Sequence, residues 1–307
     1  MESIVVSGLF NIETNTRIRS FPINYYPIDY NFFGVSSYVG GVGFNISKAL
    51  KTLGSNVLPI SMLGKDINGK NIVAALQELN IPTEYLFCCL KETPASVVLY
   101  DEAGKRQIYC DLKDIQEVKY DFSLLEKQIE NSSLVVACNT NFNRPLLSLA
   151  KQKGKIVATD VHVLSNIHDE YNKDFLEKAD IVFLSDELLP SSPKDFLFQL
   201  KETYGMKIIV LGQGEKGATL YSRDKDKFFR FSAVKPEKVV NTVGAGDALF
   251  SGFVFFYSQG FDEFEALKRG EIFASIKIGF DGASNGFSSS EKIEKVYKNT
   301  IFEIQEI

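Results

Sequence analysis

The stretch VVNTVGAGDALFSGF, residues 239–253, places glycines and a single aspartate in front of a strongly apolar segment. The apolar pair at 239–240 reads as the end of a strand, and the residues after Asp247 read as a buried helix. Glycines let the chain turn with its amide groups inward, toward the positive end of the helix that follows. The backbone of Gly244, Ala245 and Gly246 is therefore expected to form an anion hole.

Asp247 has two interpretations that the residues alone leave open. A carboxylate beside a phosphate site suits a general base that deprotonates a hydroxyl attacking that phosphate. The helix dipole would keep such a carboxylate anionic. An aspartate after a glycine turn also suits a helix N-cap, which is a purely structural role.

Length and composition describe a globular chain. The protein has 307 residues, 45% of them hydrophobic, enough for one large α/β domain or two ordinary ones. A net charge of −5 gives no general attraction to nucleic acid. The longest apolar run, 248–257, is too short for a membrane span, and the N-terminus lacks a signal-peptide pattern. A cytoplasmic location is expected, with the four cysteines reduced and no zinc site.

Apolar runs alternate with helical patterns along the chain, which is typical of a mostly parallel sheet. Strands are predicted at 3–10, 56–62, 133–138, 155–159, 180–184 and 207–212. Helices are predicted at 43–53, 67–79, 121–130, 142–153, 171–178, 192–203, 246–279 and 289–298.

Two stretches interrupt this alternation. Residues 16–39 are aromatic without helical period, and residues 95–112 read as a hairpin across Glu102–Ala103–Gly104. Both are interpreted as parts of one small β lid attached to the α/β core. Exposed strand edges of such a lid could pair with a second copy as a homodimer.

Two other glycine motifs resemble nucleotide-binding motifs but lack a feature that those motifs require. GQGEKG, residues 212–217, matches G-x-G-x-x-G, but an alternating strand follows it where a dinucleotide site needs a helix. A nicotinamide oxidoreductase is therefore rejected in favour of a tight turn between strands. GKDINGKN, residues 64–71, resembles a P-loop, but Asn71 stands where a Ser or Thr hydroxyl is required. The alternative for this segment is a helix start with Asp66 as the N-cap.

The sequence NTVGAGD resembles the D-T-x-G-A-G-D signature of the ribokinase-like (PfkB) sugar kinases. Residues 40–70 are similar to the N-terminal signature of that family, 212–221 to its nucleotide-side turn, and 282–283 to its last adenine-side loop. The resemblance covers nearly the whole chain in order. Positions that match the N-terminal signature are Gly40, Gly41, Asn45, Leu53, Gly54, Gly64, Asp66 and Gly69.

The resemblance implies a three-layer α/β/α core with a mostly parallel sheet and a β lid, forming one kinase domain over residues 1–307. It implies ATP as donor, Mg²⁺, often a monovalent cation such as K⁺ near the anion hole, and a small sugar or nucleoside with a primary hydroxyl as acceptor. Asp247 would be the catalytic base. Acceptor contacts would come from Glu13, Gly40, Gly41 and Asn45, and nucleotide contacts from Gly212, Gly214, Gly282 and Ala283.

Three departures from the family pattern stand out. Asn241 replaces an aspartate of the signature, which removes a charge near the expected cation. Ser185 and Leu188 occupy the Asn and Glu positions of an N-x-x-E segment that organises magnesium, leaving Asp186 or Glu187 to act through water. Glu13 stands where many members use Asp to hold sugar hydroxyls, so the acceptor is expected to differ from ribose.

The acceptor stays open at the level of sequence. GGVGFN, NTVGAGD and YCDLKDI resemble the pseudouridine kinase branch, although Phe44 stands where that branch carries Arg. A catalytically weak sugar-binding or regulatory relative is the alternative of another class. His162 and His168 are expected to be surface or loop residues without functional partners, and Arg17 and Arg19 are the nearest basic candidates on the lid side.

Overall fold

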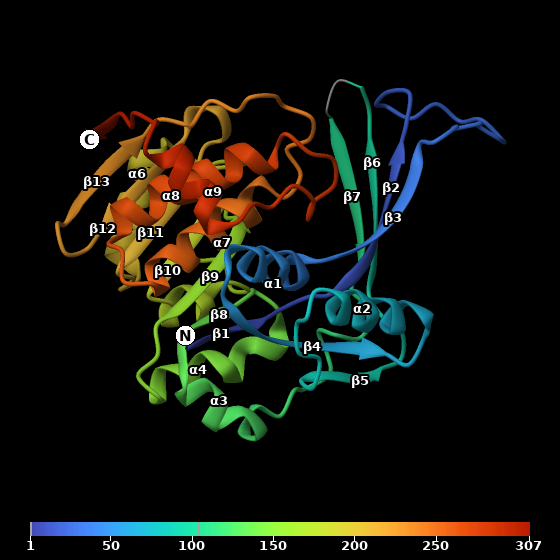
Figure 1. The fold of residues 1–307 in the computed structure, drawn as a ribbon, viewed down its shortest axis with the longest axis horizontal. Helices are drawn as coiled ribbons and strands as arrows, with labels where there is room; N and C mark the ends of the chain where they lie inside the picture. Colours follow the sequence, from blue (N-terminus) through green and yellow to red (C-terminus); the bar gives the residue numbers. More distant parts are fainter. Residues whose placement is uncertain (1, 103–104) are drawn as a thin grey trace.

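A computed structural model describes residues 2–102 and 105–307. Within these residues, one large sheet has the strand order β14-β13-β12-β11-β10-β9-β8-β1-β4-β5 (Figure 1). Pairing is parallel from β5 to β11 and antiparallel from β11 to β14. The strands are β1 (Ser3–Ser7), β4 (Asn56–Gly64), β5 (Leu86–Leu90), β8 (Ser132–Ala137), β9 (Val157–Val163), β10 (Ile181–Ser185), β11 (Ile208–Gly212), β12 (Ala218–Ser222), β13 (Lys227–Phe231) and β14 (Ile304–Glu306).

Helices cover both faces of this sheet, and each face has its own apolar core. One core packs α3 (Glu126–Glu130), α4 (Arg144–Gln152), α5 (Lys173–Lys178) and α6 (Pro193–Thr203) on the sheet. The other packs α1 (Val42–Leu53), α7 (Ala245–Ser258), α8 (Glu263–Lys277) and α9 (Ser290–Tyr297). This is the expected three-layer arrangement with a mostly parallel sheet. Short 3₁₀ turns precede α3, precede α4 and follow β11, at Phe122–Leu125, Asn141–Asn143 and Gly214–Lys216.

A second sheet forms the lid, with the order β3-β2-β6-β7. Its strands are β2 (Asn11–Arg17), β3 (Val35–Gly40), β6 (Ala95–Tyr100) and β7 (Arg106–Asp111). It stands beside α1 and α2 (Ile67–Glu78), with a third apolar cluster, which includes Phe10 and Phe44, at its base (Figure 1). The lid therefore begins at Asn11, earlier than predicted. The predicted hairpin turn at Ala103–Gly104 lies outside the described residues.

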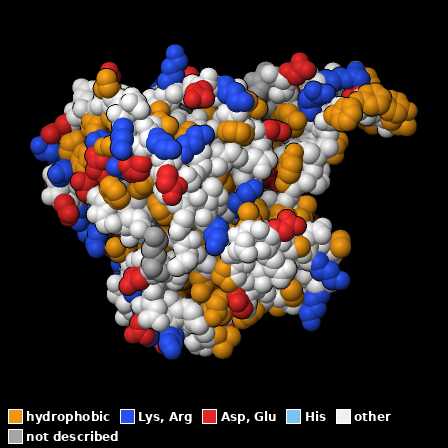
Figure 2. Space-filling model, in the orientation of Figure 1, with side chains coloured by type: hydrophobic (Ala, Val, Ile, Leu, Met, Phe, Trp, Pro, Cys, Tyr) orange, Lys and Arg blue, Asp and Glu red, His pale blue; other side chains and the backbone are white. Residues whose placement is uncertain are grey.

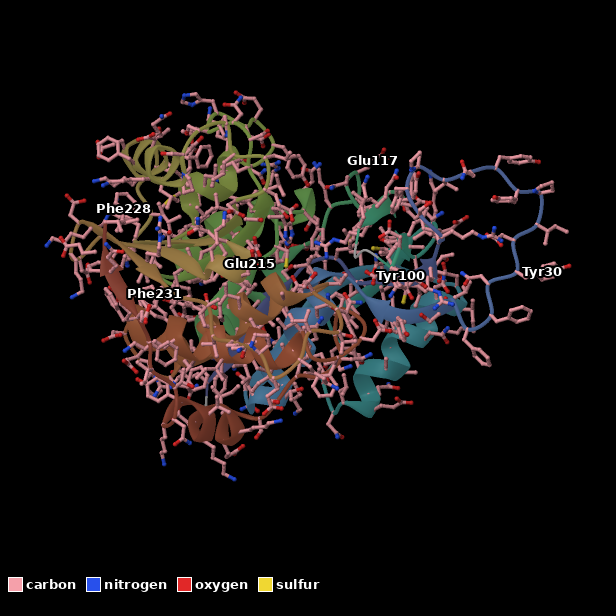
Figure 3. All side chains as sticks on the ribbon, turned by 90° about the horizontal axis from the view of Figure 1, so that it is seen from above. Tyr30, Tyr100, Glu117, Glu215, Phe228 and Phe231 are labelled. Carbon is pink, nitrogen blue, oxygen red and sulfur yellow. The ribbon has the colours of Figure 1, made fainter. Side chains whose placement is uncertain are left out.

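Residues 18–34, the aromatic loop, join β2 to β3 without forming a strand. Figure 3 places Tyr30 on this loop, well away from the α/β core, and Figure 2 shows hydrophobic side chains gathered on the projecting loop. Tyr25 is 87% exposed and Tyr30 is 77% exposed. The sequence therefore correctly located aromatic residues outside the core, but this loop, and not strands, accounts for most of the predicted lid segment 16–39.

The structure corrects the sequence prediction in three further places. The pair Val239–Val240 is exposed and belongs to no strand, and the amide of Val240 donates to the carbonyl of Ile278. Strands β5 and β14 were not predicted at all.

Across residues 2–102 and 105–307, no helix combines the length and the apolar composition that crossing a membrane requires.

The segment after GQGEKG forms the antiparallel pair β11–β12 followed by β13, as predicted from its alternating pattern. Asp66 caps α2, and its carboxylate accepts from the amide of Gly69 at 2.8 Å. Both observations favour the structural interpretation of these two glycine motifs over a dinucleotide site or a P-loop.

Close contact between α7 and α8 depends on glycine. A Cβ at Gly270 would lie 2.9 Å from the carbonyl oxygen of Leu249 and 3.2 Å from the amide nitrogen of Phe253. Since both neighbours are helix backbone atoms, they cannot move aside without separating the two helices. This contact fixes α7, the helix that begins with the Gly244–Gly246 turn.

We expect Gly270→Ala to lower the free energy of unfolding by about 1–3 kcal/mol, the usual range for overpacking. The better helix propensity of alanine, worth about 1 kcal/mol, should offset only part of the loss. Gly205→Ala is the control, because its Cβ would meet only the end of the flexible Arg223 side chain, at 3.2 Å. Urea denaturation of both variants checks this. Equal stability of the two variants would contradict the account of the α7–α8 contact.

Candidate active site

The site is built around the first turn of α7. Gly244 is the N-cap, with φ +79°, and a Cβ there would lie 2.2 Å from the carbonyl oxygen of Ala283. Glycine is therefore required both by the left-handed backbone and by the close approach of the loop around Ala283. A Cβ at Gly246 would meet nothing within 4 Å, so open space lies over this turn.

The three amides predicted for the anion hole are not equivalent. Ala245 already donates its amide hydrogen to the carbonyl of Thr242 at 3.1 Å, which closes the turn. Gly246 and Asp247 occupy the second and third positions of α7, where amides have no acceptor within the helix. The amides of the first helical turn, more than that of Ala245, are the groups suited to an anion.

Asp247 is not a helix cap. No side chain caps the N-terminus of α7, and the Asp247 carboxylate instead accepts from Nδ2 of Asn45 at 2.7 Å. Burial raises the pKa of Asp247, and the negative charge of Asp160 raises it further. His162 and the hydrogen bond from Asn45 act in the opposite direction. The expectation that the helix dipole would govern its charge is therefore replaced by a balance in which burial dominates.

Asn45 is held by the glycine turn that begins α1. Gly41 is the N-cap of α1 with φ +91°, and a Cβ there would lie 2.5 Å from the carbonyl oxygen of Leu9. The carbonyl of Gly41 accepts from the amide of Asn45 at 2.9 Å. The predicted acceptor residues Gly41 and Asn45 thus lie together and directly contact Asp247 through Asn45.

One face of the lid presents polar side chains toward this point. Glu13 lies on β2, and side chains two residues apart on a strand share a face, so Asn11 and Asn15 lie beside it. Asn11 donates to the hydroxyl of Ser96 at 2.7 Å. A Cβ at Gly40 would lie 3.3 Å from the Cβ of Glu13, so glycine leaves room beside the carboxylate.

Burial raises the pKa of Glu13, and the negative charge of Asp247 raises it further. A hydrogen bond from Asn15 and the charges of Arg106 and Lys277 lower it. The lid carboxylate and the α7 carboxylate therefore influence each other's ionisation.

Arg106 is a site residue that the sequence did not identify. Arg106 lies on β7 directly opposite Tyr100 of β6, and Tyr100 lies directly opposite Arg17 of β2. Residues that pair in this way share one face of the sheet, and Arg17 shares its face with Glu13, four residues earlier on β2. The two arginines that the sequence suggested for the lid side of the site have other contacts. Arg19 forms an ion pair with Asp29 at 2.7 Å, and Arg17 lines a separate pocket. Counting strand positions across the predicted hairpin would have placed Arg106 on this face.

His162 was predicted to be a surface or loop residue with no functional partners around it. The first part is confirmed, since its side chain is 42% exposed, but it lies near the end of β9 and not in a loop. It has φ +60°, its amide donates to Asp160 at 2.8 Å, and its charge acts on Asp247. The signal that sequence reasoning missed is its position at the carboxyl end of a parallel strand, where ligands of α/β proteins bind. The prediction for His168 was correct in part, since it lies in a surface loop.

Lys277 also escaped sequence analysis. Its side chain is fully buried at the end of α8, and its ammonium group donates to the carbonyl oxygen of Val243. Burial lowers the pKa of Lys277 to about 8, while the carboxylates of Asp247, Asp281 and Glu13 favour the charged form. A buried cation therefore lies directly behind the glycine turn.

The segments predicted for the nucleotide converge on the same edge of the sheet. Gly212 ends β11 and lies against Leu249 of α7, while Ala283 lies against Gly244. Gly214 and Gly282 both have positive φ, at +57° and +80°, and a Cβ at Gly214 would meet nothing within 4 Å. Two loops and the start of α7 thus border one open region.

The segment suspected of organising magnesium offers few ligands. Ser185 accepts from the amide of Glu187 at 3.3 Å, and the amide of Asp186 donates to the carbonyl of Gly212 at 3.0 Å. Leu188 has φ +61° and is 76% exposed. Among the described residues, no group of three or more His, Cys, Asp or Glu side chains could bind a metal ion by itself. This donor set fits Mg²⁺ that is carried mainly by phosphates and water.

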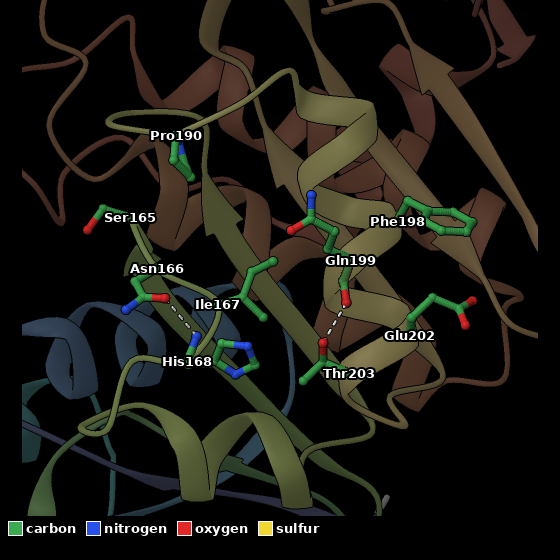
Figure 4. A pocket seen from close by; sticks show the side chains of 9 residues that line it. All are labelled: Ser165, Asn166, Ile167, His168, Pro190, Phe198, Gln199, Glu202 and Thr203. Carbon is green, nitrogen blue, oxygen red and sulfur yellow. Dashed lines mark hydrogen bonds between the residues drawn. The ribbon is translucent and has the colours of Figure 1, made fainter.

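A pocket of about 410 Å³ lies away from this site (Figure 4). Its lining comes from the loop after β9, which carries His168, and from α6, which carries Phe198 and Glu202. A second pocket of about 370 Å³ lies at the root of the aromatic loop. Neither contains Asp247 or Glu13, so the candidate site is defined by its converging polar groups and not by these hollows.

The chain matches a family model described as pfkB family carbohydrate kinase over residues 1–290. It is 26% identical to a 5-dehydro-2-deoxygluconokinase from Clostridium perfringens, covering 86% of this chain and 85% of that protein. The solved structure of microbiome-derived acarbose kinase Mak1 matches with a TM-score of 0.88 at 25% identity, covering 97% and 99%. Arabidopsis thaliana ribokinase with ribose and ATP matches with a TM-score of 0.79 at 19% identity, covering 97% and 99%. The fold is therefore ribokinase-like.

We expect Gly244→Ala to destabilise the protein more than Gly214→Ala. Both substitutions place alanine at positive φ, which costs about 1–2 kcal/mol. Only the Cβ at position 244 also meets a backbone atom, 2.2 Å away. Free energies of unfolding from urea titrations check the difference. If both variants lose the same stability, the contact between the α7 turn and the Ala283 loop does not hold the site together.

Proposed function

Since this chain belongs to the pfkB family of carbohydrate kinases and is an ATP-dependent sugar kinase, we propose that Asp247 deprotonates a primary hydroxyl of a carbohydrate that attacks the γ-phosphate of ATP. The observation that carries this proposal is the geometry of Asp247. Its carboxylate is half-buried, caps no helix, accepts a 2.7 Å hydrogen bond from Asn45 and adjoins the open first turn of α7.

The proposed reaction moves one proton and one phosphoryl group. The hydroxyl oxygen of the acceptor forms a bond to the γ-phosphorus as the bond from that phosphorus to the β-γ bridging oxygen breaks, which releases ADP. Asp247 accepts the hydroxyl proton, and its raised pKa brings it closer to the operating pH of a general base. Amides of the first turn of α7 face the phosphoryl oxygens, where fixed dipoles stabilise developing charge.

Three buried amide oxygens support recognition of hydroxyl groups. Among the described residues, Oδ1 of Asn11, Asn15 and Asn45 is buried without a hydrogen-bond partner. A buried acceptor left without a donor costs about 1–3 kcal/mol. A ligand that brings several O–H donors to the space between this face of the lid and the first turn of α1 would satisfy these oxygens together with Glu13. Sugars carry such donors on most of their carbons, whereas an apolar ligand would leave the oxygens unsatisfied.

For the acceptor we propose a chemical class and not a single compound. By name, the two relatives of 25–26% identity act on 5-dehydro-2-deoxygluconate and acarbose, whereas the ribokinase matches at only 19%. This favours a carbohydrate larger or more oxidised than ribose. ATP turnover against these two compounds, ribose, fructose 6-phosphate and pseudouridine tests it. Turnover of a carbohydrate alone supports the proposal. Selective turnover of pseudouridine supports the branch suggested by GGVGFN, and turnover of none supports a sugar-binding relative with little catalytic activity.

Mg²⁺ belongs to the proposed reaction as the ion that neutralises the phosphates of ATP. Asp160, within β9, and Asp186, directly after β10, are the carboxylates that would hold it, with water completing the coordination. The proposed reaction does not include the monovalent cation that the resemblance implies, because the oxygen atoms beside Asn241 are already engaged in hydrogen bonds.

We also propose that the lid pairs with a second copy of the chain. Support comes from exposed apolar side chains on the lid strands, with Val97 40%, Ile108 50% and Tyr109 54% exposed, and from the aromatic loop. Val97 and Tyr109 are paired across β6 and β7, so they lie on one face, and exposed apolar side chains that adjoin one another mark interaction sites. Light scattering that gives the mass of one chain at micromolar concentration would refute the pairing.

We expect Asp247→Asn to reduce kcat by about 10²–10⁴-fold, the usual effect of losing a general base. Stability and ATP affinity should change little, because the amide keeps the shape of the side chain. Asp262→Asn is the control: Asp262 caps α8 and accepts from the amides of Phe264 and Glu265. Steady-state kinetics, thermal melting and ATP titration of both variants check this. Near-normal kcat in Asp247→Asn would remove the base from the mechanism.

A further inference from the structure

A monovalent cation near residue 241 requires oxygen atoms that are free to bind it. Oδ1 of Asn241 accepts from the amide of Val243 at 2.8 Å, and Nδ2 donates to Asp281 at 2.8 Å. Both ends of the amide are thus engaged inside the protein. The carbonyl of Ile278 is also in use, because it accepts from the amides of Val240 and Asn241 at 2.8 and 3.1 Å. These oxygens do not form a cation cage.

The carbonyl of Val243 is occupied in a more specific way. It lies one residue before the N-cap of α7 and accepts from the ammonium group of Lys277. The Lys277 side chain has 0% exposure, so its charge is not shared with bulk water. A lysine buried to this degree is rare unless its charge is compensated or used.

The charges around Lys277 all belong to the candidate site. Asp247 and Asp281 favour its charged form most, followed by Glu13, while Arg106 opposes it. No carboxylate of the described residues forms an ion pair with it within 4 Å, so it is not one half of a structural salt bridge. Its direct contact is the carbonyl of the glycine turn that leads to the anion hole.

We propose that the Lys277 ammonium group is a built-in monovalent cation, which holds the Val243–Gly246 turn in place and adds positive charge behind the anion hole. This chain would then need no K⁺ for phosphoryl transfer. The neutral Asn241 agrees with this assignment. A cation that is covalently attached to the chain needs no carboxylate at position 241 to bind it. Lys277 acts here as a positioning residue, since it contacts the turn and not the acceptor.

This inference rests on the proposed function, but part of its test does not. ATP binding and thermal melting, measured without acceptor, report on the turn whether or not the correct acceptor is known. In wild-type protein, ATP affinity, melting temperature and, with an acceptor that is turned over, kcat/KM should be the same in K⁺ and in tetramethylammonium salts at about 0.1 M, where screening is equal. A large stimulation of wild-type ATP binding or turnover by K⁺ would overturn the proposal without any variant.

Two substitutions separate charge from volume. Lys277→Ala removes the ammonium group and leaves space, so ATP affinity and kcat/KM should fall and recover on addition of K⁺ or NH₄⁺. The loss expected in kcat/KM is about 10²-fold, the scale of removing one preorganised charge-stabilising group. Lys277→Met removes the charge but fills the space, so it should lose as much and recover nothing.

Lys155→Ala is the matched control, because the Lys155 ammonium group also donates to a carbonyl, that of Ser132, at 2.9 Å. Ser132 begins β8, at the end of the strand opposite the site, so this variant should show no response to K⁺ in ATP binding or melting temperature. Failure of K⁺ to raise either quantity in Lys277→Ala, or equal recovery in Lys277→Met, would contradict the proposal. If Lys277→Ala does not fold, the comparison of wild-type protein in K⁺ and in tetramethylammonium salts still tests the proposal.

Discussion

The hydrogen bond from Asn45 to Asp247 joins the first turns of α1 and α7, which are 202 residues apart in the chain. Each helix begins at a glycine with positive φ, Gly41 and Gly244, and each glycine packs against a backbone carbonyl where any side chain would collide. The two turns are therefore rigid, and the bond fixes the carboxylate between them. The loop around Ala283 packs directly on the α7 turn, and the α7–α8 contact at Gly270 holds the helix that carries it.

Electrostatics then set what the carboxylate can do. Burial raises the pKa of Asp247, and Asn45 and His162 keep it from rising further. Lys277 adds a fixed positive charge behind the same turn, and Arg106 brings a second one on the lid. Because a dry site strengthens each of these interactions, closure of the lid over an acceptor would reinforce both proton acceptance by Asp247 and stabilisation of the transferred phosphoryl group.

Sequence alone could predict the parts of this site that are local. The α/β alternation followed from apolar runs, and Asp247, Asn45 and the glycine turns lie within short motifs. Lys277 comes from a segment whose local pattern carries no signal, since its role depends on contacts made only after folding. His162 and Arg106 could have been found only from their positions, near the carboxyl end of a parallel strand and across the predicted hairpin. Val239–Val240 was misread because two β-branched residues favour a strand, whereas here no neighbouring strand pairs with them and the amide of Val240 bonds to Ile278. The departure at Asn241 was visible, but its counterpart, Lys277, was not.

The pH dependence of kcat/KM in wild-type protein and in Asn45→Ala tests the central claim most directly, because this profile reports ionisation of the free enzyme. The hydrogen bond from Asn45 stabilises the charged carboxylate, so its loss should raise the pKa of Asp247. Since activity requires the deprotonated form, the acid limb of the profile should move to higher pH in the variant, whatever the loss in absolute rate. An acid limb at the same pH in both proteins would show that Asp247, held by Asn45, is not the group whose ionisation governs the reaction.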